Sequence, residues 1–494
     1  MIAARIGRPN KRPIYIDQPG VLHCQGVGQK LRTGMKAYKI LAAIAAAAAL
    51  CSCGGDNNGN SGTAATAPPQ QTPPVTTPAV PQDPAGPVSL SISVTVTGLL
   101  GKGLVVQNNG ADTLTFDADG HAAFATPVAQ GGAYAVTVMK QPALPAQICT
   151  VDAGAGTAGS APVAVTVSCA ARTRLAIVTS LSSTAILAGD SSTGAFTATG
   201  YSVPIGGLLP PTLSRTGDFL YLTDIVANTV RAYSLDPMSG APTLLPGSPF
   251  ATGGVGPQAA AMAPNGKFFY VANRDSNTLA IFAVDESTGA LTLAGQVPTG
   301  ATPLSVAVSP NGKYLYVCNY LANTISAYSV DANTGMPGAG TAFVTPSPRF
   351  MAIDPTGKFM YVTGGNSNLV YGFTIDATTG ALIAMSAPFS AGNGASYLAI
   401  EPAGKFLYVT NESDGTASSF AINTGSGALT EILPRAAAGI LPEGIAVSPT
   451  GQYVYVAAQA DRLVKQFAID ATNGGLLPRS STSMSPLPLG IVIR

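Results

Sequence analysis

The stretch SPNGKYLYVCN at residues 309–319 decides the fold, because close variants of it recur along the chain. Its central tyrosine is Tyr316. The equivalent tyrosines of the other copies are Tyr221, Tyr270, Tyr361, Tyr408 and Tyr455. Successive tyrosines in this set are separated by 49, 46, 45, 47 and 47 residues. A period near 47 residues with four short strands per unit predicts a β-propeller, in which each repeat forms one blade.

Each repeat carries the signals of a four-stranded blade. In the copy quoted above, the apolar residues 303–308 precede the turn sequence PNG at 310–312, where Pro fixes φ and Gly supplies a positive φ. Residues 314–318 and 325–330 have the aromatic and β-branched composition of strands. The sequence DANTG at 331–335 predicts a second turn, in which the Asp side chain accepts a backbone N–H.

The two ends of the repeat region predict a closed ring. Residues 175–180 match the second strand of a blade, but no first strand precedes them. The chain ends at 488–494 in PLGIVIR, which matches the first strand PEGIAV at 442–447. We therefore expect the C-terminal strand to complete the first of seven blades over 174–494, so that no sheet edge is exposed there.

An export signal is predicted at 35–53. Lys36 and Lys39 give it a positive start, residues 40–50 form an apolar run, and the sequence LCSC ends it at Cys53. Eleven residues are too few to span a bilayer, which needs roughly 20. The segment resembles the signal peptides of bacterial lipoproteins, which implies that Cys53 is lipidated and anchors an exported protein in a membrane. The alternative is a buried, alanine-rich helix.

The residues on either side of this signal suggest no folded structure. Residues 1–34 precede a second methionine, and we interpret them as an upstream extension of a protein that starts at Met35. Gly54 follows the cysteine where an Asp would favour retention in the inner membrane, so we expect the outer membrane, facing the periplasm or the cell surface. Residues 54–88 are rich in Gly, Asn, Thr, Pro and Gln, which predicts a disordered tether.

A small β-sandwich is predicted between the tether and the propeller. Residues 89–170 contain several stretches that alternate apolar residues with Ser or Thr. Cys149 and Cys169 each lie beside a Thr/Val strand, and we expect them to form a disulfide in a domain too small to rely on its core. The module resembles the immunoglobulin-like domains found ahead of propellers in bacterial envelope proteins. Cys318 lies alone in a blade and is expected to be a packed, small hydrophobic residue.

Composition excludes several kinds of partner. The chain has a net charge of +1 and only 10% charged residues, which argues against nucleic acid binding. It has no Trp, which excludes the tryptophan–aspartate class of propeller by its signature. No clustered His residues suggest a metal, and we expect no cofactor. A monomer is expected.

The repeat sequence Pro-x-Gly-Lys-(Phe/Tyr)-x-Tyr-Val-x-Asn, followed by Asp-x-x-Thr-Gly, resembles the seven-bladed lactonase propellers, the 6-phosphogluconolactonase and carboxymuconate-cyclase group. The resemblance covers 174–494. It implies the fold more firmly than the activity, because related tyrosine–valine (YVTN) repeat propellers on cell surfaces are not enzymes.

The resemblance also implies where an active site would lie. In this family, a His, two Arg and a Glu gather at one mouth of the central channel. One family Arg falls on Arg349, but the His position holds Leu304 and the Glu position holds Gly365. The second Arg falls near Glu412. One of the four positions is therefore kept.

Hydrolysis of a lactone at neutral pH requires a general base and a cation over the developing oxyanion. Arg349 is the candidate cation. The two histidines, His23 and His121, lie outside the propeller, so the candidate bases are Glu443 and Glu412, provided that burial raises their pKa. The alternative for all three side chains is a solvated charge at the rim.

Two main functions remain open. In the first, a cell-envelope lipoprotein uses a degenerate lactonase site to bind a small anionic sugar acid, a lactone or an envelope protein. In the second, the protein is an extracytoplasmic lactonase with a rearranged active site. A third possibility is that the propeller only shapes a surface. Since three family positions differ, we expect no turnover of 6-phosphogluconolactone above its spontaneous hydrolysis.

Overall fold

The computed structural model describes residues 88–494, apart from 143–146, 205–209 and 366. The predictions for the upstream extension, the signal peptide with Cys53 and nearly all of the tether lie outside these residues. The described residues form strands and turns, and none of them belongs to a helix that could cross a membrane. The chain is all-β, as its sequence predicts.

The first folded region is a β-sandwich. One sheet has the order β5-β2-β10-β8, the other has the order β4-β3-β7-β9, and β1 pairs with β6. The strands are β1 (Ser89–Leu90), β2 (Ile92–Thr97), β3 (Leu104–Asn108), β4 (Asp112–Phe116), β5 (Gly120–Ala123), β6 (Val128–Ala129), β7 (Ala133–Lys140), β8 (Gln147–Asp152), β9 (Ala155–Thr157) and β10 (Val163–Ala171). Alternate residues of β2 are buried, namely Ile92, Val94 and Val96, because successive side chains of a strand point to opposite faces.

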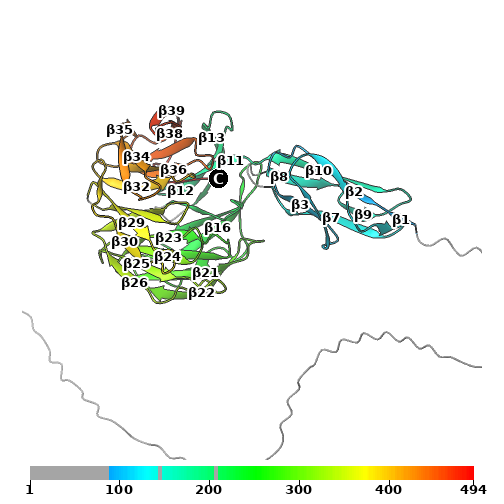
Figure 1. The fold of residues 1–494 in the computed structure, drawn as a ribbon, viewed down its shortest axis with the longest axis horizontal. Coiled ribbons are helices and arrows are strands. Elements are labelled where there is room, and N and C mark those ends of the chain that lie inside the picture. The colour runs from blue at the N-terminus through cyan, green and yellow to red at the C-terminus, as the bar shows by residue number, and fades with distance from the viewer. Residues whose placement is uncertain (1–87, 143–146, 205–209, 366) are drawn as a thin grey trace, which may run out of the picture. The chain divides into compact units, whose positions relative to one another are not determined.

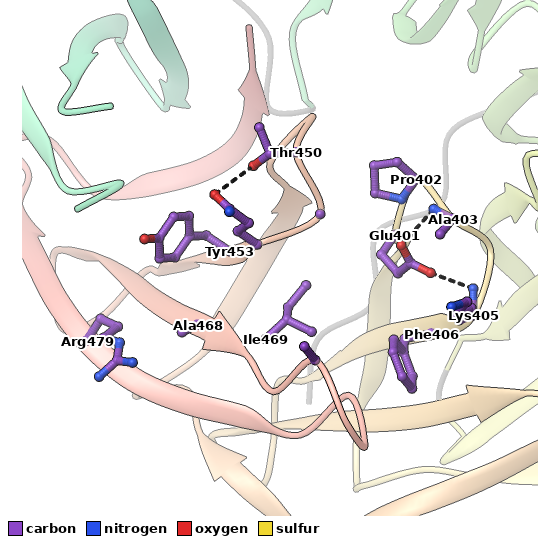
Figure 2. Close-up of a pocket in the computed structure, with 13 residues that line it drawn as sticks. Glu401, Pro402, Ala403, Lys405, Phe406, Thr450, Tyr453, Ala468, Ile469 and Arg479 are labelled. Atoms are coloured by element: carbon purple, nitrogen blue, oxygen red, sulfur yellow. Dashed lines mark hydrogen bonds between the residues drawn. The ribbon is translucent and has the colours of Figure 1, made fainter. Parts of the chain in front are cut away.

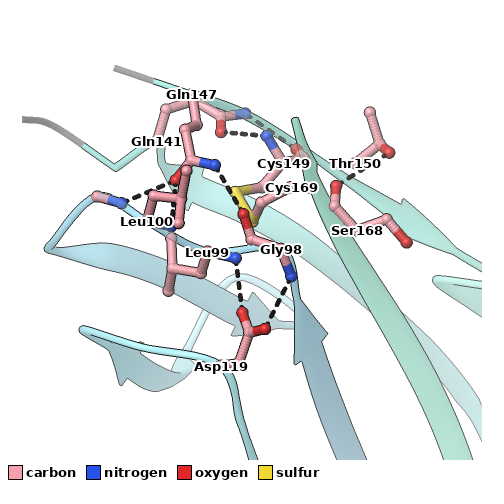
Figure 3. Close-up of a disulfide and its surroundings, with 11 residues drawn as sticks. Gly98, Leu99, Leu100, Asp119, Gln141, Gln147, Cys149, Thr150, Ser168 and Cys169 are labelled. Carbon is pink, nitrogen blue, oxygen red and sulfur yellow. Dashed lines mark hydrogen bonds between the residues drawn. A yellow bond between two sulfur atoms is a disulfide. The ribbon is translucent and has the colours of Figure 1, made fainter. Parts of the chain in front are cut away.

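The predicted disulfide between Cys149 and Cys169 is present. It joins directly opposed residues of β8 and β10 (Figure 3). Beside it, the buried Gln147 side chain accepts the backbone N–H groups of Leu100 and Gly101 at 2.7 and 2.8 Å, and it donates to the carbonyl of Gly98 at 2.7 Å. The disulfide and this amide together hold the loop after β2 against β8.

The second folded region is a seven-bladed β-propeller (Figure 1). From the innermost strand outward, the blades follow. Blade 1 has β40 (Pro488–Ile493), β11 (Arg174–Ser180), β12 (Ser183–Gly189) and β13 (Phe196–Pro204); blade 2 has β14 (Thr212–Leu213), β15 (Phe219–Asp224), β16 (Thr229–Leu235) and β17 (Pro242–Leu244), with β18 (Phe250–Ala251) also on β16; blade 3 has β19 (Pro257–Met262), β20 (Phe268–Asn273), β21 (Thr278–Val284) and β22 (Leu291–Pro298).

Blades 4 to 7 repeat this arrangement. Blade 4 has β23 (Pro303–Val308), β24 (Tyr314–Asn319), β25 (Thr324–Ser329) and β26 (Thr341–Val344); blade 5 has β27 (Pro348–Ile353), β28 (Phe359–Gly364), β29 (Leu369–Ile375) and β30 (Leu382–Ala384), with β31 (Phe389–Ser390) also on β29; blade 6 has β32 (Ala395–Ile400), β33 (Phe406–Asn411), β34 (Thr416–Ile422) and β35 (Leu429–Ala437); blade 7 has β36 (Pro442–Val447), β37 (Tyr453–Ala458), β38 (Leu463–Ile469) and β39 (Leu476–Ser483).

The ring closes as predicted, because β40 pairs antiparallel with β11 and completes blade 1. Figure 1 marks the C-terminus beside β11. The last residue, Arg494, donates hydrogen bonds to the backbone carbonyls of Thr173, Gly217 and Pro237 at 3.1, 3.3 and 3.2 Å. Its side chain thereby ties blade 1 to the turns of blade 2.

The repeated tyrosines join the other blades. Each lies in the second strand of its blade, is buried, and donates its hydroxyl to the carbonyl of the turn glycine in the next blade. The pairs are Tyr221–Gly289, Tyr270–Gly335, Tyr316–Gly380, Tyr361–Gly427, Tyr408–Gly474 and Tyr455–Gly194, at 2.7 to 3.0 Å. In blade 1 the equivalent residue is Ile177, and Arg494 secures that junction instead. The sequence repeat is therefore the record of an interblade contact.

Candidate functional site

The propeller has two faces with different chemistry. The hairpin face carries the turns between the first and second strands and between the third and fourth strands, such as 310–312 and 331–335. The mouth face carries the starts of the innermost strands, the ends of the second strands and the loops beside them. The candidate residues Arg349, Glu412 and Glu443 all belong to the mouth face.

One structurally equivalent position recurs at the channel in six blades. The first residue of the innermost strand pairs with the end of the second strand, and the regular register is then interrupted. Such irregularities commonly redirect a side chain. The residues directly after this first pair are Gln258, Leu304, Arg349, Ser396, Glu443 and Leu489. Three candidate positions from the sequence are thus equivalent places on blades 4, 5 and 7.

A second equivalent position follows the second strand. There the backbone N–H bonds the carbonyl of the loop that leads into the innermost strand of the same blade, as at Gly365 (2.7 Å) and Glu412 (2.9 Å). Gly365, where the family has a Glu, has no room for a side chain, because a Cβ atom would lie 2.4 Å from the ring of Tyr320. Tyr320, the equivalent residue of blade 4, occupies that space.

The structure brings the three candidate side chains together from blades 5, 6 and 7. A nitrogen of Arg349 lies 2.8 Å from Oε1 of Glu412, and both side chains are partly exposed. Burial raises the pKa of Glu443 to about 7, and the negative charge of Glu412 adds to this effect. The positive charge of Arg349 opposes it, and a hydrogen bond with Glu412 further favours the protonated form. Glu443 therefore exchanges a proton near neutral pH.

Aromatic packing and one hydroxyl hold these groups in place. The rings of Phe350 and Tyr397 stack with their centroids 3.9 Å apart, and the guanidinium carbon of Arg349 lies 5.3 Å from the Phe350 centroid. Thr410 Oγ1 accepts the backbone N–H of Tyr397 at 3.1 Å and donates to the carbonyl of Glu443 at 2.9 Å. The strands that carry the site are therefore cross-linked at the point where it forms.

Sequence reasoning missed Ser396 and Tyr397. Ser396 lies on blade 6 at the position equivalent to Arg349 and Glu443, and its buried hydroxyl has no hydrogen-bond partner among the described residues. Burial raises the pKa of Tyr397, and the charge of Glu443 raises it further. An alignment of the innermost strands would have found both residues, since ASY at 395–397 occupies the place of PRF at 348–350.

Neither the hairpin-face cavity nor the free thiol offers comparable chemistry. A cavity of about 720 Å³ lies between blades 6 and 7 on the hairpin face (Figure 2). Its acid, Glu401, accepts the backbone N–H groups of Ala403 and Lys405 at 2.7 and 2.5 Å, so it caps a turn. Cys318 is buried, as expected, and burial raises its thiol pKa. Among the described residues, no group of His, Cys, Asp and Glu side chains could hold a metal ion.

Comparisons with known proteins agree with this architecture. A family model described as "Lactonase, 7-bladed beta-propeller" matches residues 212–346, 305–394 and 382–493, which together span more than half of the chain. A periplasmic gluconolactonase of Pseudomonas aeruginosa has a similar structure, with 21% identity and a TM-score of 0.57 over 65% of this chain and 98% of that one. A search of curated proteins found no significant match.

Two further solved structures are similar. A putative 6-phosphogluconolactonase of Bacteroides fragilis aligns with a TM-score of 0.58 and 20% identity over 65% of this chain and 98% of that one. Another, from Bacteroides uniformis, aligns with a TM-score of 0.56 and 22% identity over 65% and 99%. At these identities the likeness concerns the fold alone.

Proposed function

Because the chain belongs to the seven-bladed β-propeller lactonase family, we propose that its mouth-face cluster hydrolyses a lactone outside the cytoplasm with a rearranged set of residues. The observation that carries this proposal is the position of Glu443. Its pKa, raised to about 7, is that of an effective general base at neutral pH, and it lies beside the Arg349–Glu412 pair. Glu443 thus takes the role that the absent family His would have had.

The cluster supplies each proton and charge that the reaction needs. Ionised Glu443 accepts a proton from a water molecule, whose oxygen attacks the lactone carbonyl. Arg349 stabilises the oxyanion that develops there. When the ring C–O bond breaks, protonated Glu443 returns the proton to the leaving oxygen, which restores the carboxylate. Glu412 positions Arg349 and, through its own charge, helps to keep the pKa of Glu443 high.

A second candidate function is ligand binding without chemistry by a degenerate site. It is favoured by the ion pair itself, because Glu412 neutralises part of the charge of Arg349 before any substrate arrives. Leu304 and Gly365 at the family's His and Glu positions favour it as well. In this case a sugar acid, a lactone or an envelope protein would bind at the mouth without turnover.

The decisive experiment is a lactonase assay on the purified full-length protein with glucono-δ-lactone and δ-valerolactone. We expect hydrolysis above the spontaneous rate, with kcat/KM falling below pH 7 as Glu443 becomes protonated. Glu443→Gln should lower kcat by about 10²–10⁴-fold. The matched control is Glu286→Gln, an exposed residue of a hairpin-face turn, which should leave the rate unchanged.

Other outcomes separate the candidates. Hydrolysis that survives Glu443→Gln would assign the chemistry to different residues. If the protein hydrolyses neither lactone but binds one of them, as measured by calorimetry, the binding function is the correct one.

We further propose that the protein is an exported lipoprotein, anchored through Cys53, and that the sandwich is an immunoglobulin-like module. The predicted signal at 35–53 supports export, and one similar structure is named as a periplasmic enzyme. Cys53→Ala should leave an uncleaved, unacylated precursor in cell fractions. A mature N-terminus at any residue other than Cys53 would contradict this.

A further inference from the structure

We propose that the mouth takes an uncharged lactone that carries an aliphatic chain, an inference that rests on the proposed hydrolase function and names its substrate class. The argument has two parts. The charges of the cluster disfavour an anionic substrate, and the loops around the cluster are unusually apolar.

The charge balance comes first. Arg349 is already paired with Glu412, and Glu443 adds a second carboxyl group beside this pair. One guanidinium against two carboxyls leaves the cluster neutral when Glu443 is protonated and negative when it is ionised. A phosphate or carboxylate substrate would therefore approach an ionised general base, and like charges repel. An uncharged lactone avoids this repulsion.

Other cations near the mouth are also paired. Nitrogen–oxygen distances are 2.7 Å for Arg274–Asp275, 2.6 Å for Arg435–Glu431 and 3.7 Å for Lys465–Asp461. These pairs leave little positive charge to attract an anion. The site thus differs from one in which Arg349 alone would bind a sugar acid.

The apolar loops are the second observation. Exposed aliphatic side chains lie in the loops after the second strands and before the innermost strands. They are Leu181, Val226, Val255, Leu321, Ile440 and Leu441, with exposed fractions of 43 to 83%. In the turns of the hairpin face, Met238 is the exposed large hydrophobic residue among the described ones. Single exposed aliphatic residues are ordinary, but their concentration on one face favours binding of an apolar group.

These side chains flank the catalytic cluster. Leu441 is two residues before Glu443, and its carbonyl accepts the N–H of Gln459 at 3.1 Å, which fixes the loop. On the other flank, the half-buried Leu304 occupies the position on blade 4 that Arg349 occupies on blade 5. Leu321 follows Tyr320 on the same blade. A lactone ring at blades 5 to 7 would therefore have aliphatic surface on both sides for its chain.

The test compares lactones with the same ring and chains of increasing length, δ-hexalactone, δ-decalactone and δ-dodecalactone, together with 6-phosphogluconolactone. We expect kcat/KM to rise at least about tenfold from δ-hexalactone to δ-decalactone, as methylene groups become partly buried. The phosphorylated lactone should be the poorest substrate.

Variants locate the effect. Leu321→Asn with Leu441→Asn should remove most of the gain with chain length while leaving the rate on δ-hexalactone unchanged. Val344→Asn is the control, because Val344 is 85% exposed on the outer strand β26, away from the mouth. A gain that persists in the double variant would overturn the assignment to these loops.

The remaining outcomes distinguish this inference from the proposed function. An active enzyme whose kcat/KM is flat with chain length, or that prefers the phosphorylated lactone, overturns the substrate class and leaves the hydrolase intact. If no lactone is hydrolysed, the hydrolase fails. Chain-dependent binding of the corresponding δ-lactams, measured by calorimetry, would then still support the ligand class, and its absence would overturn it. Sedimentation with phosphatidylcholine vesicles that Leu321→Asn abolishes would assign the loops to a membrane instead.

Discussion

The carboxylates of the two propeller faces behave in opposite ways. On the hairpin face, Asp331 accepts the backbone N–H groups of Asn333 and Thr334 at 3.0 and 2.8 Å, and these bonds lower its pKa. Asp285 does the same in blade 3, with a pKa of about 2. On the mouth face, burial beside Glu412 raises the pKa of Glu443 to about 7.

The difference shows what makes a carboxylate reactive. Donors from a turn stabilise the ionised form, so the aspartates remain charged and do structural work at any physiological pH. Burial next to a second carboxyl has the opposite effect, and it leaves a group that gains and loses a proton near neutrality. Both kinds of acid are common in this chain, and only their surroundings separate them.

The largest change would remove the ring on which both faces depend. Deleting residues 487–494 removes β40, whose Leu489, Ile491 and Ile493 are buried. At roughly 1.5–3 kcal/mol for each side chain, the free energy of unfolding should fall by several kcal/mol, and the open edge of β11 should promote aggregation. Thermal denaturation and size-exclusion chromatography measure both effects. A truncated protein that is monomeric and melts at the wild-type temperature would contradict the closure.

A sharper test of the comparison uses the pH dependence of stability. Because the pKa of Glu443 is higher in the folded state than its ordinary value, the folded protein binds more protons between about pH 4.5 and 7. The free energy of unfolding should therefore decrease as the pH rises through this window. Glu443→Gln should flatten that slope and stabilise the protein at pH 8 by roughly 1–3 kcal/mol. Urea unfolding at several pH values measures this, and an unchanged slope in the variant would show that Glu443 is not perturbed.

A smaller effect tests how the hairpin face is joined to the neighbouring blade. Tyr316→Phe removes the hydroxyl that donates to the carbonyl of Gly380 and leaves that buried oxygen without its donor. The cost should be about 1–2 kcal/mol, with no change in lactone hydrolysis. Tyr201→Phe, on an exposed tyrosine of β13, is the control and should have no measurable effect. Equal stability of the two variants would exclude a role for the interblade hydrogen bond.

The smallest effect is expected at a turn aspartate. Asp331→Ala removes an acceptor of turn N–H groups and should lower the melting temperature by only a few degrees, because the group is exposed. Since its pKa is lowered in the folded state, this contribution is present at neutral pH and is lost as the pH falls through the lowered pKa. The difference between wild type and variant should therefore vanish in acid. A loss of lactonase activity in this variant would break the division between the two faces.

The repeats made most of the fold predictable from sequence. The spacing of the tyrosines gave the blades, and the match between residues 488–494 and 442–447 gave the closure, because both reflect strand pairing within a regular unit. Arg349, Glu412 and Glu443 could be named individually. Their contact could not be predicted, since it depends on how far three side chains from three blades reach across the mouth. The tight space at Gly365 also escaped, because the ring of Tyr320 fills it from another repeat.

The pairing of β40 with β11 has a consequence for the order of synthesis. The first propeller strand to leave the ribosome waits for the last, so blade 1 stays incomplete until translation has reached the final residues. Blades 2 to 7 can form from contiguous segments in the meantime, as local units usually do. A prematurely terminated chain would have no means of shutting the circle, and its unpaired edge would distinguish it from the finished product for chaperones and proteases.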